Sequence, residues 1–74
     1  MTSIATLLPG EYATIHAIHA EDSLFQRLAA LGFRIGKKIE LVRRASFNGP
    51  LHVRIGTTDI ILRLSEARRI QIIH

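Results

Sequence analysis

The sequence predicts a mainly β domain in which short strands close into a small barrel and one short helix lies between the first two strands. Three observations favour this fold. The chain has 74 residues, which is enough for one domain and no more. Residues 51–55 alternate strictly between apolar and polar side chains, as a strand with one buried face does. Glycine-containing turn signals separate the candidate strands at short intervals, as in small barrels.

The composition indicates an aliphatic core in a protein of the cytoplasm. Hydrophobic residues make up 47% of the chain and aromatic residues only 5%. There is no cysteine, so packing must provide nearly all of the stability, and disulfides and thiolate metal sites are excluded. No apolar run approaches the roughly 20 residues that span a bilayer, and the N-terminal stretch is a poor signal peptide. We therefore expect a cytoplasmic protein with no segment inserted in a membrane.

A short helix is predicted after the first strand, because three leucines recur there at helical spacing. We expect their shared face to pack in the core; the three are Leu24, Leu28 and Leu31. Ser23 is followed three residues later by a glutamine, which is the pattern of a capping box at a helix N-terminus. Gly32 comes directly after the last leucine, where a helix often ends on a residue with positive φ.

Five strands are predicted, at residues 11–18, 38–45, 51–55, 60–64 and 70–72. Between the second and third strands, Asn48-Gly49 is expected to form a turn with positive φ. Residues 56–59 close the next hairpin. A single helical turn with Ser65 as its N-cap is expected before the last strand. Closure of so short a sheet into a barrel leaves no long bare edges.

The charge balance is basic. Ten Lys and Arg residues against six acidic residues give a net charge of +4. A basic protein of this kind has two candidate classes of partner: nucleic acid, and an anionic membrane or protein surface. The cations are spread along the chain without a run of like charges, and few aromatic residues are present to stack on bases. We favour a solvated exterior over a nucleic-acid-binding patch.

Nothing in the residue pattern indicates catalysis or a bound metal. The four histidines match no familiar ligand spacing; they are His16, His19, His52 and His74. His16 and His19 are three residues apart, so on a strand they point to opposite faces unless a bulge intervenes. There is no nucleophile elbow and no glycine-rich phosphate loop. We expect no enzyme activity, no small-molecule substrate, no metal ligands and no cofactor.

Recognition of another protein remains as the function to consider. Phe47 is a large apolar residue at the predicted hairpin tip. It either folds back onto the barrel or anchors a partner, since exposed aromatic residues often mark interfaces. Arg44 and Leu51 flank it in the sequence and could complete a patch. Phe47, Arg44 and Leu51 are therefore the candidate partner-binding residues.

Four blocks of the sequence resemble the FeoA family of small SH3-like proteins. They are residues 7–11 (LLPGE), 27–36 (RLAALGFRIG), 48–51 (NGPL) and the tail from Gly56 to Ile70. The second block and the tail are fairly specific when they occur in this order. Ile35 departs from the pattern, since family members commonly carry proline before this glycine. The resemblance covers almost the whole chain and implies one SH3-like domain over residues 1–74, with five strands, one helix and a helical turn.

The resemblance also implies a function. FeoA-like proteins are associated with bacterial ferrous iron uptake, and the implied partner is FeoB, a membrane transporter with a GTP-binding domain. The expected role is a cytoplasmic accessory protein that binds FeoB and supports or regulates it. The same domain occurs at the end of metal-responsive repressors of the DtxR type, but no helix-turn-helix precedes it here. A metal-responsive regulatory module and a nucleic-acid-binding module are the alternatives.

Overall fold

The computed structural model describes residues 2–74. The strands are β1 (Thr2–Ser3), β2 (Tyr12–Ile18), β3 (Lys38–Arg44), β4 (Leu51–Ile55), β5 (Thr58–Leu62) and β6 (Ile70–Ile73). The helices are a 3-10 helix, η1 (Ile4–Thr6), and two α-helices, α1 (Asp22–Ala30) and α2 (Leu64–Ala67). The mainly β fold is confirmed, with one helix after the first long strand and a helical turn before the last strand.

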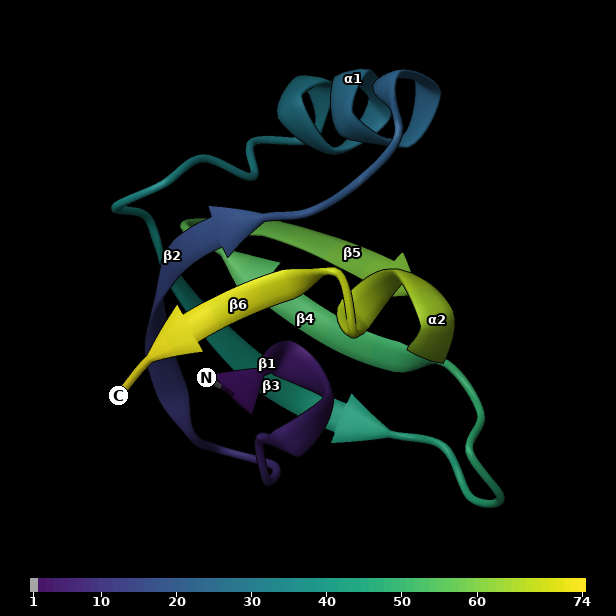
Figure 1. Ribbon diagram of the computed structural model, residues 1–74. Coiled ribbons are helices and arrows are strands. Elements are labelled where there is room, and N and C mark those ends of the chain that lie inside the picture. Colours follow the sequence, from purple (N-terminus) through teal and green to yellow (C-terminus); the bar gives the residue numbers. More distant parts are fainter. Residues whose placement is uncertain (1) are drawn as a thin grey trace.

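The strands form one antiparallel sheet in the order β1-β6-β2-β3-β4-β5. The sheet curls back on itself, so that β6 lies in front of β4 in Figure 1. The register shifts between Ile15 and Ala17 in β2, and between Leu41 and Arg43 in β3. Such bulges bend a strand and increase its twist, which lets so short a sheet curl into a barrel.

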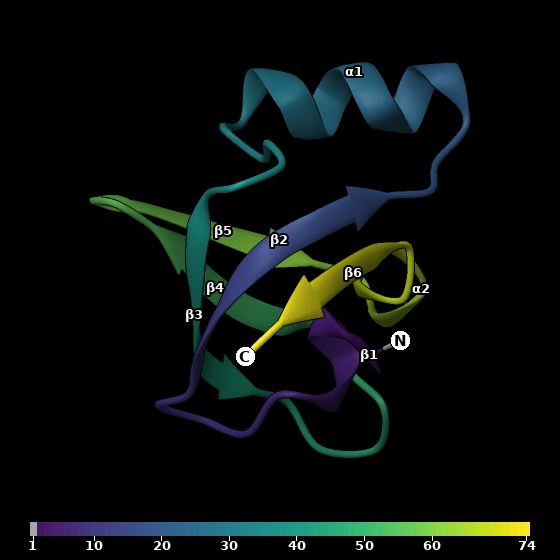
Figure 2. The same ribbon diagram turned by 60° about the vertical axis from the view of Figure 1, so that its left-hand side comes forward.

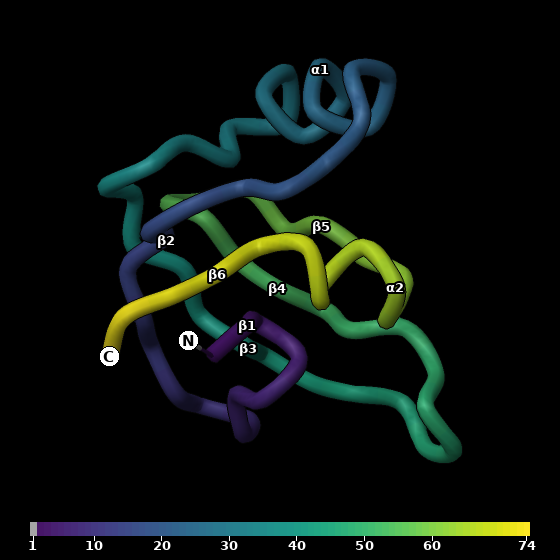
Figure 3. The backbone as a smooth tube through the Cα atoms, viewed as in Figure 1, coloured from purple at the N-terminus to yellow at the C-terminus, as the bar shows by residue number. Residues whose placement is uncertain are grey.

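The sixth strand was not predicted. It is the two-residue strand β1, which pairs with β6 through Thr2–Ile72 and Ser3–Gln71. This pairing brings the two ends of the chain near each other, as the tube in Figure 3 shows.

None of the helices within residues 2–74 has the length and the apolar character that a membrane span needs.

The core is aliphatic, as the composition indicated. Alternate residues of the long strands point inward and are buried, as the strict pattern of residues 51–55 predicted. Phe33 is the one aromatic residue among the buried residues of the described chain. The inward residues of β3 to β6 are Ile39, Leu41, Leu51, Val53, Ile55, Ile60, Leu62, Ile70 and Ile72.

Helix α1 contributes less to this core than its leucine spacing predicted. Leu28 is fully buried, whereas Leu24 is half-buried and Leu31 is exposed. The helix stands off the sheet at one end of the molecule in both ribbon views (Figures 1 and 2). Of its nine residues, Leu28 is the one that is fully buried. Phe33, in the loop that follows, is buried in the same core.

The N-terminus of α1 differs from the prediction. The helix begins at Asp22, with Glu21 as its N-cap and no capping hydrogen bond from a side chain. The Ser23 hydroxyl instead donates to the Glu21 carboxylate at 3.2 Å. The predicted capping box is therefore wrong, because the helix starts two residues earlier than the serine pattern indicated. Gly32 has φ 103° and ends the helix as expected.

Helix α2 begins at Leu64, with Arg63 rather than Ser65 as its N-cap. The predicted cap is thus wrong by two residues. The Glu66 carboxylate accepts a 2.9 Å hydrogen bond from the Arg63 backbone N–H, which satisfies one donor at the helix start. Glu66 also accepts a hydrogen bond from Arg27, and this ion pair links α1 to α2.

Candidate partner-binding surface

The loop between β3 and β4 projects from the barrel at the lower right of Figure 1. The backbone N–H of Ala45 donates to the carbonyl of Pro50 at 3.0 Å, and that of Gly49 donates to the carbonyl of Ser46 at 3.2 Å. At the tip, Phe47 has φ 58° and its side chain is 100% exposed. Of the two placements considered for this side chain, the structure shows the one that points into solvent.

The turn at this tip is offset by one residue from the predicted Asn-Gly turn. Phe47 and Asn48 carry the positive φ values, 58° and 60°, as the two central residues of a type I′ turn do. Gly49 is needed for space instead, because a Cβ atom there would lie 2.7 Å from the Cβ of Ala45. A left-handed conformation costs a bulky residue about 1–2 kcal/mol. The loop therefore holds an exposed aromatic residue in an unfavourable backbone conformation.

The other two candidate residues do not share this surface. Leu51 is fully buried, because it lies on the inward face of β4. Arg44 is half-buried, and its guanidinium donates to the backbone carbonyls of Leu7 at 2.7 Å and Ala5 at 3.0 Å. Arg44 therefore fixes the N-terminal segment to β3. Of the three candidates, Phe47 is the one whose side chain is free to meet a partner.

The structure adds residues that the sequence interpretation missed. Two shallow hollows lie beside the base of the hairpin, and both are lined by Pro50 and Ile61. Arg43 lines one of them and Arg63 the other. Ile61 is 64% exposed, because it faces outward from β5 opposite His52. We call Phe47, Pro50, Ile61, Arg43 and Arg63 the hairpin surface.

A sequence signal for Ile61 was available. Ile60 and Ile61 are adjacent in a strand, and successive side chains of a strand point to opposite faces. Once Ile60 faces the core, Ile61 must face solvent. For Arg43 and Arg63 the sequence gives no such signal, because their neighbourhood depends on how β3 and the start of α2 are placed around β4 and β5.

The outer face of β4 and β5 beside the hairpin surface carries a charged network. Arg54 donates to Asp59 through Nε at 2.6 Å and through Nη2 at 3.2 Å. These hydrogen bonds hold the pKa of Asp59 below its ordinary value. The buried Nε2 atom of His52 lies 3.2 Å from Asp59 Oδ2. The network links strand β4 to its neighbour β5.

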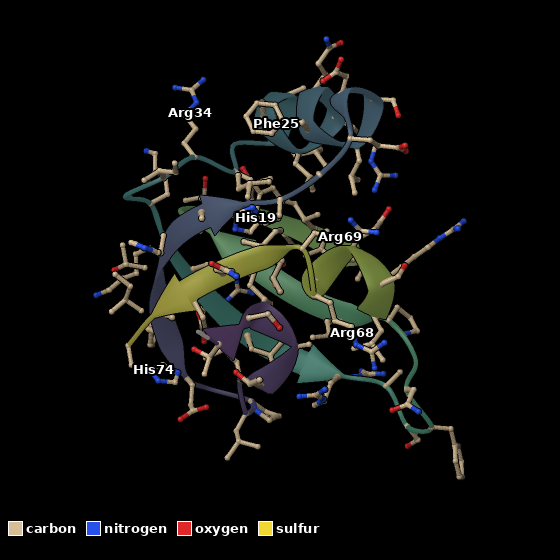
Figure 4. The ribbon with its side chains drawn as sticks, in the orientation of Figure 1. His19, Phe25, Arg34, Arg68, Arg69 and His74 are labelled. Atoms are coloured by element: carbon tan, nitrogen blue, oxygen red, sulfur yellow. The ribbon has the colours of Figure 1, made fainter. Side chains whose placement is uncertain are left out.

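The histidines are not gathered into one site. Among residues 2–74, no three His, Cys, Asp or Glu side chains are arranged to hold a metal ion. His16 follows Ile15 at the bulge of β2, and it is exposed, as is His19. Figure 4 shows His19 and His74 in different parts of the molecule.

Comparisons with known proteins identify the family. The model of the FeoA domain matches residues 2–74. Iron(II) transport protein A from Clostridium thermocellum superposes with a TM-score of 0.91 at 32% identity, over 96% of this chain and 44% of that one. FeoA from Stenotrophomonas maltophilia, a zinc complex described as a prokaryotic SH3 domain protein, has a TM-score of 0.81 at 30% identity, over 99% of this chain and 91% of that one.

A manganese-dependent transcriptional repressor is also similar, with a TM-score of 0.89 at 19% identity, which shows a shared fold alone. This chain spans 40% of the repressor and 44% of the Clostridium protein. No curated protein sequence matches the chain. The family model nevertheless covers all of residues 2–74, and the similar FeoA structures share the SH3-like barrel. The chain belongs to the FeoA family, which is associated with ferrous iron transport.

Proposed function

We propose that the protein is a cytoplasmic accessory of bacterial ferrous iron uptake that binds a FeoB-like membrane GTPase transporter and supports or regulates it. Membership of the FeoA family supports the iron-transport context. One similar protein is named iron(II) transport protein A, and another is described as a candidate activating factor of bacterial ferrous iron transport. The proposed role is binding rather than catalysis, with the cytoplasmic part of the transporter as the target.

The observation that best supports this proposal is the exposure and the backbone conformation of Phe47. Its side chain is 100% exposed, so it does not pack in the core, and its backbone is in the left-handed region, with φ 58°. Strained residues of this kind cluster at functional sites. Large aromatic side chains at an interface supply much of the binding energy when they enter a pocket of the partner. Phe47 is therefore the proposed anchor.

The rest of the hairpin surface suits an acidic partner. Pro50 and Ile61 provide apolar area at the base of the loop whose tip carries Phe47, and Arg43 and Arg63 are exposed beside them. The nearby carboxylate of Asp59 is already held by Arg54. A positive border of this kind speeds the encounter with a negative surface and fixes the orientation of the complex. Docking would act on transport if the partner's states bind the hairpin surface with different affinities.

Titration of the purified cytoplasmic domain of the FeoB-like transporter tests this proposal. The wild-type protein should bind, and Phe47→Ala should weaken binding about 30-fold, which corresponds to about 2 kcal/mol. Tyr12→Ala is the matched control, because Tyr12 is 54% exposed but lies at the start of β2, outside the hairpin surface. Arg43→Gln should slow association and make it less dependent on salt.

Two results would contradict the proposal. A folded wild-type protein that does not bind the transporter domain would remove the proposed partner. Equal losses in Phe47→Ala and Tyr12→Ala would remove the hairpin surface as the site. A parallel titration with RNA and DNA separates the alternative function, since nucleic-acid binding should be tight at low salt and fall steeply as salt increases.

A further inference from the structure

A second exposed surface lies at the α1 end of the molecule, away from the hairpin that carries Phe47 (Figure 1). It is built on a tight turn, in which the backbone N–H of Lys37 donates to the carbonyl of Arg34 at 3.1 Å. Ile35 and Gly36 are the central residues, and Gly36 has φ 92°, as the third position of a type II turn requires. Ile35, at the apex, is 71% exposed.

The turn is fixed to the barrel rather than loose. The backbone N–H of Gly36 donates to the carbonyl of Ile15 at 2.8 Å, and the N–H of Ile15 donates to the carbonyl of Lys37 at 2.8 Å. Both hydrogen bonds join the turn to β2. Ile35 is therefore presented to solvent by an ordered backbone, which reduces the entropy that a contact at this position would cost.

Cations surround the exposed isoleucine. Arg34 and Lys37 are exposed on either side of it, and neither takes part in an ion pair of the described chain. Residues 31–39 contain no acid. Phe25 of α1 adds a second apolar side chain that is 46% exposed. Figure 4 shows Phe25 and Arg34 at the same end of the molecule, with Arg34 pointing away from the barrel.

We propose that this turn surface, made of Arg34, Ile35, Lys37 and Phe25, contacts a membrane that contains anionic phospholipid. An apolar side chain at a convex apex can enter the boundary between headgroups and acyl chains, while the flanking cations face the phosphate groups. A soft bilayer can receive such an apex without a matching pocket. The hollows described above beside the hairpin are lined by residues other than these four.

The membrane contact is independent of the proposed transporter contact. The hairpin surface and the turn surface lie at different ends of the barrel, so one remains accessible while the other is engaged. A weak membrane contact would confine the protein near the bilayer, where an integral membrane partner is found. Either interaction can therefore be tested without the other.

Sedimentation with vesicles tests the membrane contact. The wild-type protein should sediment with vesicles of mixed phosphatidylglycerol and phosphatidylcholine, and much less with pure phosphatidylcholine, and binding should fall as salt increases. Arg34→Gln and Lys37→Gln should each lower the partition coefficient about fivefold. Ile35→Ser should lower it about tenfold, because it removes the apolar side chain that enters the bilayer. Circular dichroism should show that all three variants remain folded, since the altered side chains are exposed.

Matched variants elsewhere provide the controls. Arg68→Gln removes the same charge from a residue that Figure 4 places away from α1, and Ile73→Ser removes an isoleucine that is 51% exposed in β6. Both should bind vesicles like the wild type. The proposal is overturned if the wild type does not sediment with the anionic vesicles, or if the control variants lose as much binding as those in the turn.

Discussion

The Arg44 guanidinium donates a 2.7 Å hydrogen bond to the backbone carbonyl of Leu7, which lies 37 residues earlier in the chain. A second hydrogen bond, 3.0 Å long, goes to the carbonyl of Ala5. Leu7 is fully buried, and the adjacent helix η1 contacts α2 and β6. Arg44 was a candidate partner-binding residue because it is near Phe47 in the sequence. In the structure it instead holds the N-terminal segment against the barrel.

Replacement of this arginine should reduce stability and leave transporter binding unchanged. Arg44→Met keeps most of the aliphatic stem but removes both charged hydrogen bonds, so the free energy of unfolding should fall by about 2 kcal/mol. For a domain of this size that corresponds to a decrease in Tm of about 10 °C. Arg43→Met, at the exposed neighbouring position, should change stability by less than about 0.5 kcal/mol. Loss of transporter binding in Arg44→Met without loss of stability would instead give Arg44 a direct role in the interface.

Substitution of Phe47 should affect stability and binding in opposite directions. Phe47→Asn places a residue that tolerates positive φ at this position, so the free energy of unfolding should rise by about 1 kcal/mol. Affinity for the transporter domain should fall, because the aromatic anchor is removed. Thermal unfolding and a binding titration of the same variant check both effects. A less stable variant would show that the phenylalanine side chain packs against the protein in solution.

Gly49→Ala should destabilise the same hairpin for a different reason. The added Cβ would lie 2.7 Å from the Cβ of Ala45, so the loop must shift, at a cost of about 1–2 kcal/mol. Asn48→Gly is the control within the loop, because its φ of 60° suits glycine and should leave stability within about 1 kcal/mol of the wild type. Urea unfolding measures both. Equal stability of Gly49→Ala and the wild type would mean that the close approach of residues 45 and 49 is relaxed without cost.

The carboxylate of Asp59 should make stability depend on pH in the acid range. Its pKa is lowered in the folded protein, chiefly by the hydrogen bonds from Arg54, while the unfolded chain has the ordinary value of about 3.9. In this range the unfolded state therefore binds more protons, so stability increases with pH. The contribution of the Asp59 carboxylate to the free energy of unfolding is fully present above its pKa in the unfolded chain. It is lost as the pH falls through its pKa in the folded protein.

Urea midpoints measured as a function of pH check this dependence. Asp59→Asn and Arg54→Gln should both flatten the acid part of the profile relative to the wild type, because each removes one partner of the pair. At neutral pH both variants should have lower midpoints than the wild type, and this difference should shrink on acidification. An unchanged acid slope in Arg54→Gln would assign the dependence to other carboxylates.

Much of the fold could be predicted from local patterns. The alternation of residues 51–55 predicted the burial pattern of β4. Gly32 has the positive φ that its position directly after a helix indicated. The helix boundaries were less predictable, because Ser23 and Ser65 have capping chemistry but the chain starts both helices earlier. The side-chain pattern alone does not fix those starts, since the connections to the neighbouring strands also constrain them.

The candidate surface was predicted only in part. The turn signal between two strands placed Phe47 at a hairpin tip but left open whether its side chain folds back onto the barrel. Its full exposure and its left-handed backbone were seen only in the structure. Leu51 was included because it is near in sequence, although its own alternation places it in the core. Ile61 and Arg63 meet Pro50 through the pairing of β5 with β4 and the start of α2.

The sequence by itself determined the class of structure and the family, because strand alternation, glycine positions and the blocks of FeoA resemblance are properties of neighbouring residues. The tertiary structure alone decided which exposed side chains are available to a partner. It turned Arg44 toward backbone carbonyls far away in the chain, and it left the loops that carry Phe47 and Ile35 at different ends of the barrel. The physical reason is that exposure depends on which segments pack over a residue, and in this protein those segments are distant in sequence.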